Sequence, residues 1–206
     1  MPSSETVPSK LMTIALDLQV EICTFLHPSD ILSLRKVCHG SIYCSYSAIQ
    51  IFKACKALHF VTRRRIVWIE ALHRVCRDNT LFIPSFPIPD MSDVELERAA
   101  TAPHRWINLC AALAKKQTIF CTRPNPKATR FIELTAPRPN IHNFLVPGGR
   151  YLLSHSLNRM EIWDLGYTPR AECKLLASIE LEYRPANYMY STTPDGMGLI
   201  IVLQMG

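Results

Sequence analysis

The chain has 206 residues, of which 48% are hydrophobic and 19% charged, a globular composition that excludes disorder throughout. Its 23 basic residues outnumber its 17 acidic residues by six, a modest excess that identifies no partner. No run approaches the roughly 18 apolar residues of a membrane-spanning helix, and the first ten residues do not resemble a secretory signal, so we expect a soluble protein of the cytoplasm or nucleus. The eight cysteines include no Cys-x-x-Cys pair and are interpreted as reduced, buried thiols.

The first forty residues predict a polar tail followed by two amphipathic helices. Residues 1–10 contain two prolines and few apolar side chains, which predicts a disordered tail. Apolar residues recur every three or four positions over residues 15–26, which predicts a first helix. Pro28 ends that pattern and suits the first turn of a second helix that closes near Gly40. Together the two helices carry more apolar surface than they can bury against each other, which indicates a partner.

Further helices and one extended segment are expected up to residue 116. Apolar spacing predicts a third helix over residues 42–55 and a fourth around Trp68. The prolines of residues 80–91 forbid a helix there and predict an extended strap laid over the helices.

A fifth helix is expected to start at residue 93, because Ser92 and Glu95 form a capping box. Pro103 is expected to begin a separate helix, in which Trp106, like Trp68 earlier in the chain, belongs to the core.

After about residue 120 the composition changes to short β-like runs separated by turn residues. The runs are RFIEL, HNFLVPGGRYLLSHS, MEIWDLG, KLLASIELEY and NYMYSTTPDGMGLIIVL. Strand follows strand without helices between them, which predicts antiparallel pairing. The expected fold class is therefore α+β, with helices in the first part of the chain and antiparallel strands in the second.

Residues 14–38 resemble an F-box, the module that joins substrate receptors to Skp-type adaptors in cullin-RING ubiquitin ligases. The resemblance rests on Leu18 to Ile22, on the Leu26-x-Pro28-x-Asp30 turn, and on the apolar residues from Ile31 to Cys38. An F-box usually opens with Leu-Pro, whereas Ile14 and Ala15 stand here, so a proline preset for the first turn is missing. On periodicity alone, the same helices could pack onto their own chain. The resemblance implies that the adaptor is contacted by Leu16, Leu18, Ile22, Leu26, Pro28, Ile31, Leu32, Leu34 and Val37.

Residues 146–166 are similar to a WD-type propeller segment. A Pro147-Gly148-Gly149 turn precedes one strand, and a second strand ends in Trp163-Asp164, with Trp163 expected between sheet layers or blades. A turn and strand recur about 47 residues later, at Pro194-Asp195-Gly196, close to the blade length of about 40 to 45 residues. Because a propeller closes with at least about four blades, the strands are expected to form an incomplete β-propeller or a small open sheet.

The order of these features resembles the F-box proteins of mushroom-forming fungi. We expect four regions: a tail (1–10), an F-box-like helical domain (11–60), a helical linker with the Pro-rich strap (61–120), and a β-rich, propeller-like segment (121–206), either truncated or completed elsewhere.

The resemblance implies an adaptor subunit of an SCF-type ubiquitin ligase, which binds a Skp-type adaptor, and through it a cullin, and presents an unidentified protein substrate. The alternative is a stand-alone scaffolding protein whose helices cap its own β domain.

No catalytic, cofactor or metal site is expected. The chain has no Gly-x-Ser-x-Gly, His-Glu-x-x-His or glycine-rich phosphate-binding motif. His73 with Cys76, and Cys38-His39 with Cys44, each supply at most part of a zinc site. Arg63 to Arg65 are interpreted as a solvated cluster, because no aromatic residues interleave with them as in nucleic-acid-binding proteins. We therefore expect a protein that is not an enzyme and binds neither nucleic acid nor membrane.

Overall fold

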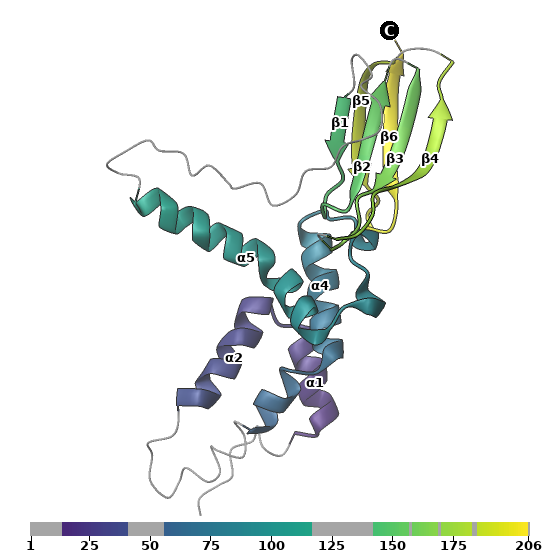
Figure 1. The fold of residues 1–206 in the computed structure, drawn as a ribbon. Coiled ribbons are helices and arrows are strands. Elements are labelled where there is room, and N and C mark those ends of the chain that lie inside the picture. The colour runs from purple at the N-terminus through teal and green to yellow at the C-terminus, as the bar shows by residue number, and fades with distance from the viewer. Residues whose placement is uncertain are drawn as a thin grey trace, which may run out of the picture. The chain divides into compact units, whose positions relative to one another are not determined.

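The computed structural model describes residues 14–40, 56–116, 142–156, 158–168, 170–182 and 185–205. Its elements combine helices with antiparallel sheets (Figure 1), which confirms the α+β class. Contacts divide the chain into a helical unit, with described residues 14–40, 56–74 and 90–116, and a β unit, with described residues 75–89 and 142–205. In chain order the elements are α1 (Leu16–Thr24), α2 (Pro28–Gly40), α4 (Arg65–Asp78), the 3₁₀ helices η2 (Ile83–Ser85) and η3 (Ile88–Asp90), α5 (Asp93–Lys116), β1 (His142–Leu145), β2 (Tyr151–Ser156), β3 (Arg159–Asp164), β4 (Lys174–Glu180), β5 (Pro185–Thr192) and β6 (Leu199–Met205).

Side-chain hydrogen bonds anchor both ends of α1. Ala15 is the N-cap residue, with ψ 146°, and no side chain caps the first turn. The side chain of Gln19 instead donates from Nε2 to the Ile14 carbonyl at 3.0 Å, which anchors the entry to the helix. At the other end, Arg74 of α4 donates to the carbonyl of Thr24. The first bond thus ties the residue before the N-cap to the helix, and the second satisfies a carbonyl in its last turn.

His27 and Pro28 produce the break and restart between α1 and α2. The carbonyl of His27 accepts the N–H groups of Asp30 at 2.9 Å and Ile31 at 3.1 Å, and its ring Nδ1 accepts that of Ser29 at 3.3 Å. Pro28 lies at the first helical position, where its missing amide costs no hydrogen bond. Asp30 lies in the first turn, where a carboxylate favours the positive end of the helix dipole.

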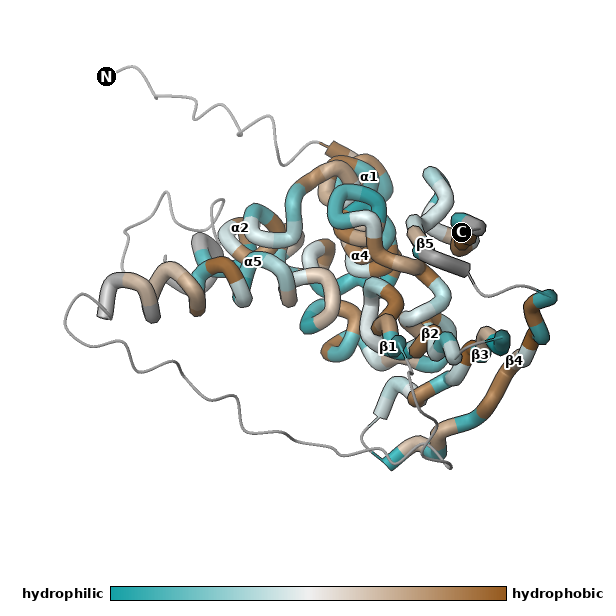
Figure 2. The backbone as a smooth tube through the Cα atoms, turned by 90° about the horizontal axis from the view of Figure 1, so that it is seen from above, coloured by the Kyte–Doolittle hydropathy of each residue, from teal (hydrophilic) through white to brown (hydrophobic). Residues whose placement is uncertain are grey.

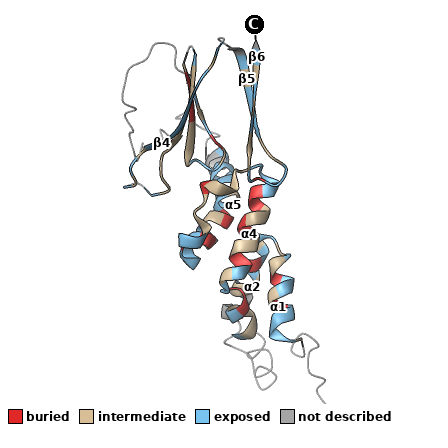
Figure 3. Ribbon diagram, turned by 90° about the vertical axis from the view of Figure 1, so that its right-hand side faces the viewer, coloured by how far each residue is buried: buried red, intermediate tan, exposed pale blue. Residues whose placement is uncertain are grey.

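The helical unit has a core centred on the first part of α4, along which Figure 3 shows buried residues. Trp68 is buried and donates from Nε1 to the Thr62 carbonyl at 2.9 Å. Ile31 of α2 and Leu96 of α5 are also fully buried. Burying an aliphatic side chain of this size stabilises the fold by about 1.5–3 kcal/mol. The prediction that Trp68 belongs to the core is confirmed.

The capping box at the start of α5 is confirmed, whereas the predicted second helix at Pro103 is wrong. Ser92 N–H donates to Glu95 Oε2 at 2.8 Å, and Glu95 N–H donates to Ser92 Oγ at 3.3 Å. The helix then continues to Lys116 with Pro103 inside it. A proline in a helix interior costs about 3 kcal/mol, but the Ala- and Leu-rich sequence after it favours helix and carries α5 onward.

Trp106 in the second half of α5 lies at the surface. Its side chain is 66% exposed, so the prediction that it belongs to the core is wrong. Ile107 and Leu109 are exposed as well. Apolar spacing indicates that a helix has an apolar face, but the spacing does not determine whether that face is covered.

The β unit contains a four-stranded antiparallel sheet in the order β1-β2-β3-β4 and a two-stranded antiparallel sheet of β5 and β6 (Figure 1). In the first sheet Leu152 pairs with Trp163 and Leu153 with Ile162. The predicted antiparallel pairing is confirmed for these strands. The RFIEL run, the tail at residues 1–10 and the third helix predicted over residues 42–55 lie outside the described residues.

The Pro-rich strap is bound to turns of the β unit, and it is not uniformly extended, because it contains η2 and η3. Phe82 N–H donates to the Pro147 carbonyl at 3.0 Å, and Ile83 N–H donates to the Gly196 carbonyl at 2.9 Å. These bonds make the strap part of the β unit, so the predicted linker of residues 61–120 is divided between the two units.

Candidate functional site

An exposed apolar row consists of Leu18 and Ile22 of α1 together with Phe25, the C-cap residue of that helix. Their side chains are 52%, 50% and 72% exposed, and steps of four and three residues place them on one side of the helix. Gln19 and Cys23 are the buried residues of α1. The helix therefore packs on its own chain through a mixed face and leaves a more apolar face accessible. Figure 3 shows the exposed stretch of α1.

The structure separates the residues that the F-box resemblance assigned to the adaptor. Leu16 is exposed, as are Leu18 and Ile22 of the row. Pro28 and Ile31 are buried in the helical unit and cannot contact a partner unless the unit opens, so we correct their assignment to that of core residues. Three others, Leu26, Leu32 and Leu34, are half-buried, and the side chain of Val37 is not among those described.

Phe25 is a candidate contact that the assigned set omits. It is the most exposed of the three residues in the row. Its position seven residues after Leu18 places it on the same side of the helix, so the spacing itself could have identified it.

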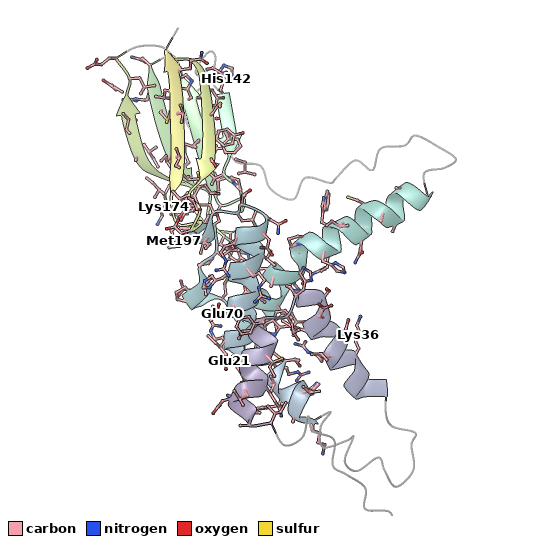
Figure 4. All side chains as sticks on the ribbon, turned by 180° about the vertical axis from the view of Figure 1, so that it is seen from behind. Glu21, Lys36, Glu70, His142, Lys174 and Met197 are labelled. Carbon is pink, nitrogen blue, oxygen red and sulfur yellow. The ribbon has the colours of Figure 1, made fainter. Side chains whose placement is uncertain are left out.

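Charged side chains are exposed on α1, which carries most of the exposed row, and on α2. Glu21 of α1 and Lys36 of α2 are exposed and project from their helices (Figure 4). Asp17 and Asp30 are exposed as well. Exposed apolar and charged side chains thus occur on the same helix, and protein-binding surfaces combine both kinds.

Arg35 fixes the orientation of α2 in the helical unit. Its guanidinium donates from Nη1 to Glu97 Oε2 of α5 at 2.8 Å and from Nη2 to the Thr62 carbonyl at 2.7 Å. The guanidinium carbon lies 5.4 Å from the centre of the Trp68 ring, over its face. One side chain thus joins α2, α4 and α5, which holds α2 in a defined position in the helical unit.

In the β unit, Arg150 and Asp164 form a bidentate ion pair between the first glycine turn and the end of β3. Arg150 Nε donates to Asp164 Oδ1 at 2.9 Å, and Nη2 donates to Oδ2 at 2.7 Å. Asp164 Oδ1 also accepts the N–H of Gly166 at 2.8 Å. The hydrogen bonds from Arg150 are the main cause that lowers the pKa of Asp164 below its ordinary value. The aspartate of the predicted Trp-Asp segment thus connects the end of β3 to Arg150 and to the Gly166 backbone.

Apolar side chains are exposed on β4, the last strand in the order of its sheet. Leu175, Leu176 and Ile179 are all exposed. Figure 2 shows the hydrophobic character of this strand along most of its length. An exposed apolar edge strand is a surface on which another chain can pair or pack.

The described cysteines differ in exposure. Cys23 and Cys76 are buried, and burial raises the pKa of Cys76 to about 11. Cys110 is exposed on α5, which corrects the expectation that all the cysteines are buried. The described residues contain no cluster of three or more potential metal ligands. Among their helices, none combines the length and apolarity that crossing a membrane requires.

Comparisons of the chain with protein-family models, with curated proteins and with solved structures find no match.

Proposed function

We propose that this chain is a substrate-recognition subunit of an SCF-type (cullin-RING) ubiquitin ligase, and that its first two helices bind a Skp-type adaptor. The observation that carries the proposal is the exposed row of Leu18, Ile22 and Phe25, which immediately precedes the Pro28 helix start. Helices that dock in a partner groove use anchors at positions i, i+4 and i+7, which is the spacing of this row. In this role the chain performs no catalysis, and other subunits transfer ubiquitin.

The adaptor-binding surface that we propose differs from the set implied by the F-box resemblance. It consists of the exposed row together with Leu16, Leu26, Leu32 and Leu34, and by resemblance Val37. Pro28 and Ile31 are not part of this surface. Pro28 begins α2, and Ile31 anchors that helix in the core. Anchors held on packed helices lose less conformational entropy on binding than anchors on loops.

For the β unit we propose that β1 to β4 are one propeller-type blade and that β5 and β6 begin another. The antiparallel order β1-β2-β3-β4 supports this proposal, because propeller blades are four-stranded sheets. The recurring turns at Gly148 and Gly196 support it as well, since both have positive φ angles of 111° and 71°. In this arrangement the exposed residues of β4 offer a surface for a protein substrate.

The test is capture of a purified Skp-type adaptor by the full-length chain and by a Leu18→Ala/Ile22→Ala double variant. We expect at least tenfold weaker binding in the variant, because truncating a central anchor costs about 2 kcal/mol or more. Both residues are half exposed, so the fold should persist, which circular dichroism checks.

Ile66→Ala is the matched control, since Ile66 is an exposed isoleucine on α4 and its loss should not affect capture. Equal capture by wild type and the double variant would contradict the proposed surface. A folded wild-type chain that captures no adaptor would instead favour the alternative, a scaffolding protein without a link to a ligase.

A further inference from the structure

An arginine-lined pocket opens in the helical unit. Its volume is about 640 Å³, and its walls come from α2, α4, the turn before α4 and the first half of α5. Sites for small molecules have volumes of about 300–1,000 Å³. The pocket is therefore large enough for a ligand the size of a small organic molecule.

The charges of the lining residues do not cancel. Of its four arginines, Arg35 is paired with Glu97 at 2.8 Å. The pocket's other carboxylate, that of Asp93, is paired with Arg65 at 3.3 Å. The three remaining arginines form no ion pair within the part of the chain that the structure describes, and all three are exposed: Arg63, Arg98 and Arg105. The pocket thus holds three positive charges that its own carboxylates do not pair, although Arg98 also interacts electrostatically with the Glu95 carboxylate, which does not line the pocket.

These three side chains come from two different elements. Arg98 and Arg105 lie seven residues apart on α5, on one side of the helix and about 10 Å apart along its axis. Arg63 lies in the turn before α4. Trp68, which is buried, and Leu32 contribute apolar surface to the same pocket. Such surface lowers the local dielectric constant, which strengthens the interaction of the guanidinium groups with an anion.

We propose that this pocket binds a phosphorylated small molecule that carries at least two phosphoryl groups, held by Arg63, Arg98 and Arg105. The planar guanidinium fork matches the oxygens of a phosphoryl group in a bidentate way. One phosphate ester carries a charge of about −1.5 to −2 at pH 7, so two such groups balance three guanidinium charges. This site contains no residue of the exposed row on α1 and shares only Leu32 with the proposed adaptor-binding surface, so ligand binding is measured on the chain without adaptor.

The test is a calorimetric titration of the full-length chain, without adaptor, with sodium tripolyphosphate at physiological salt. We expect saturation at one equivalent, and about tenfold weaker binding for Arg98→Gln and for Arg105→Gln, because each variant removes one charge-assisted hydrogen-bond donor to the phosphoryl oxygens. Arg77→Gln is the matched control: it removes the same charge from an exposed arginine that does not line the pocket, and binding should not change.

A second variant tests the pocket without removing a charge. Val94 lines the pocket and is 68% exposed, so Val94→Trp should leave the fold intact while filling space that the ligand needs. We expect this variant to bind tripolyphosphate at least tenfold more weakly, and it decides the question if an arginine variant fails to fold.

Three results would overturn the proposal. The first is the absence of saturable binding to the wild-type chain. The second is an equal loss in the Arg77→Gln control, which would indicate general charge attraction. The third is tighter binding of a phosphoserine peptide than of tripolyphosphate, which would assign the pocket to a protein segment.

Discussion

At the scale of single residues, the Arg150–Asp164 pair determines how one turn of the β unit responds to pH. The Asp164 side chain is mostly buried, and both its oxygens accept hydrogen bonds from Arg150. Because Arg150 lowers the pKa of Asp164 in the folded chain, the pair stabilises the fold at pH values above the carboxyl's unfolded pKa of about 3.9. That contribution is lost as the pH falls through the lower folded pKa.

We predict that Asp164→Asn lowers the free energy of unfolding by about 1–3 kcal/mol at pH 7. The amide oxygen can still accept a hydrogen bond from the Gly166 N–H. The loss of stability therefore measures mainly the ion pair with Arg150. Urea unfolding at pH 7 and at pH 3 measures the effect, and the difference from wild type should shrink at pH 3, because the carboxyl of the unfolded chain, with its ordinary pKa of about 3.9, is then largely protonated.

Glu180→Gln is the control for this measurement. Glu180 pairs with Arg159 at 3.2 Å but is largely exposed, so its removal should change stability by less than about 1 kcal/mol. An equal effect of Asp164→Asn at both pH values would contradict the electrostatic explanation.

At the scale of elements, α2 depends on a side chain that reaches two other parts of the helical unit. Arg35 contacts Glu97, Thr62 and Trp68 at once. We predict that Arg35→Met destabilises the chain by about 2–4 kcal/mol, because it leaves the Glu97 carboxylate without its partner and removes a donor from the Thr62 carbonyl. Urea unfolding followed by circular dichroism measures the loss.

Glu97→Gln is the milder companion to Arg35→Met. The glutamine keeps an oxygen that can accept a hydrogen bond from Arg35. We therefore expect it to lower the free energy of unfolding by less than half as much as Arg35→Met does. If Arg35→Met unfolds at the same urea concentration as wild type, α2 is held in place by apolar packing alone.

The elements that sequence predicted well are those whose signals lie within a few residues. The Ser92–Glu95 capping box, the Pro28 helix start and the strands flanking Gly148 and Gly149 all follow from local chemistry. The extension of α5 through Pro103 was missed, because the preference of the following residues for helix outweighs one lost hydrogen bond.

The candidate site was predicted only in part, for a related reason. Apolar spacing located a stripe on α1 and one on α2, but the side that packs depends on contacts far away in the sequence. On α1 the buried side contains Gln19, whereas Leu18 and Phe25 remain exposed. On α2, Ile31 is buried although the F-box resemblance assigned it to the partner.

At the scale of the whole molecule, the two units are not consecutive in sequence, because the chain leaves the helical unit for the β unit and returns to it before the strands begin. Residues 75–89 belong to the β unit, although they lie between two segments of the helical unit. Removing residues 1–60 would therefore not isolate a domain, because it would take Ile31 and Arg35 from the core that contains Trp68 and Leu96. Variants that loosen one connection at a time are the better probe of this organisation.

Two adjacent glycines in the first turn of the β unit provide such a probe, since both have positive φ angles, 111° at Gly148 and 79° at Gly149. A Cβ atom on Gly148 would lie 2.5 Å from Ser85 of the strap, whereas one on Gly149 would meet no atom within 4 Å. Alanine costs backbone strain of about 1–2 kcal/mol in the left-handed region, but only Gly148→Ala also pushes the strap away. We predict that Gly148→Ala accelerates amide hydrogen exchange at Phe82 and Ile83 at least tenfold more than Gly149→Ala does. Equal exchange in the two variants would show that the strap does not depend on this turn, and would contradict its place in the β unit.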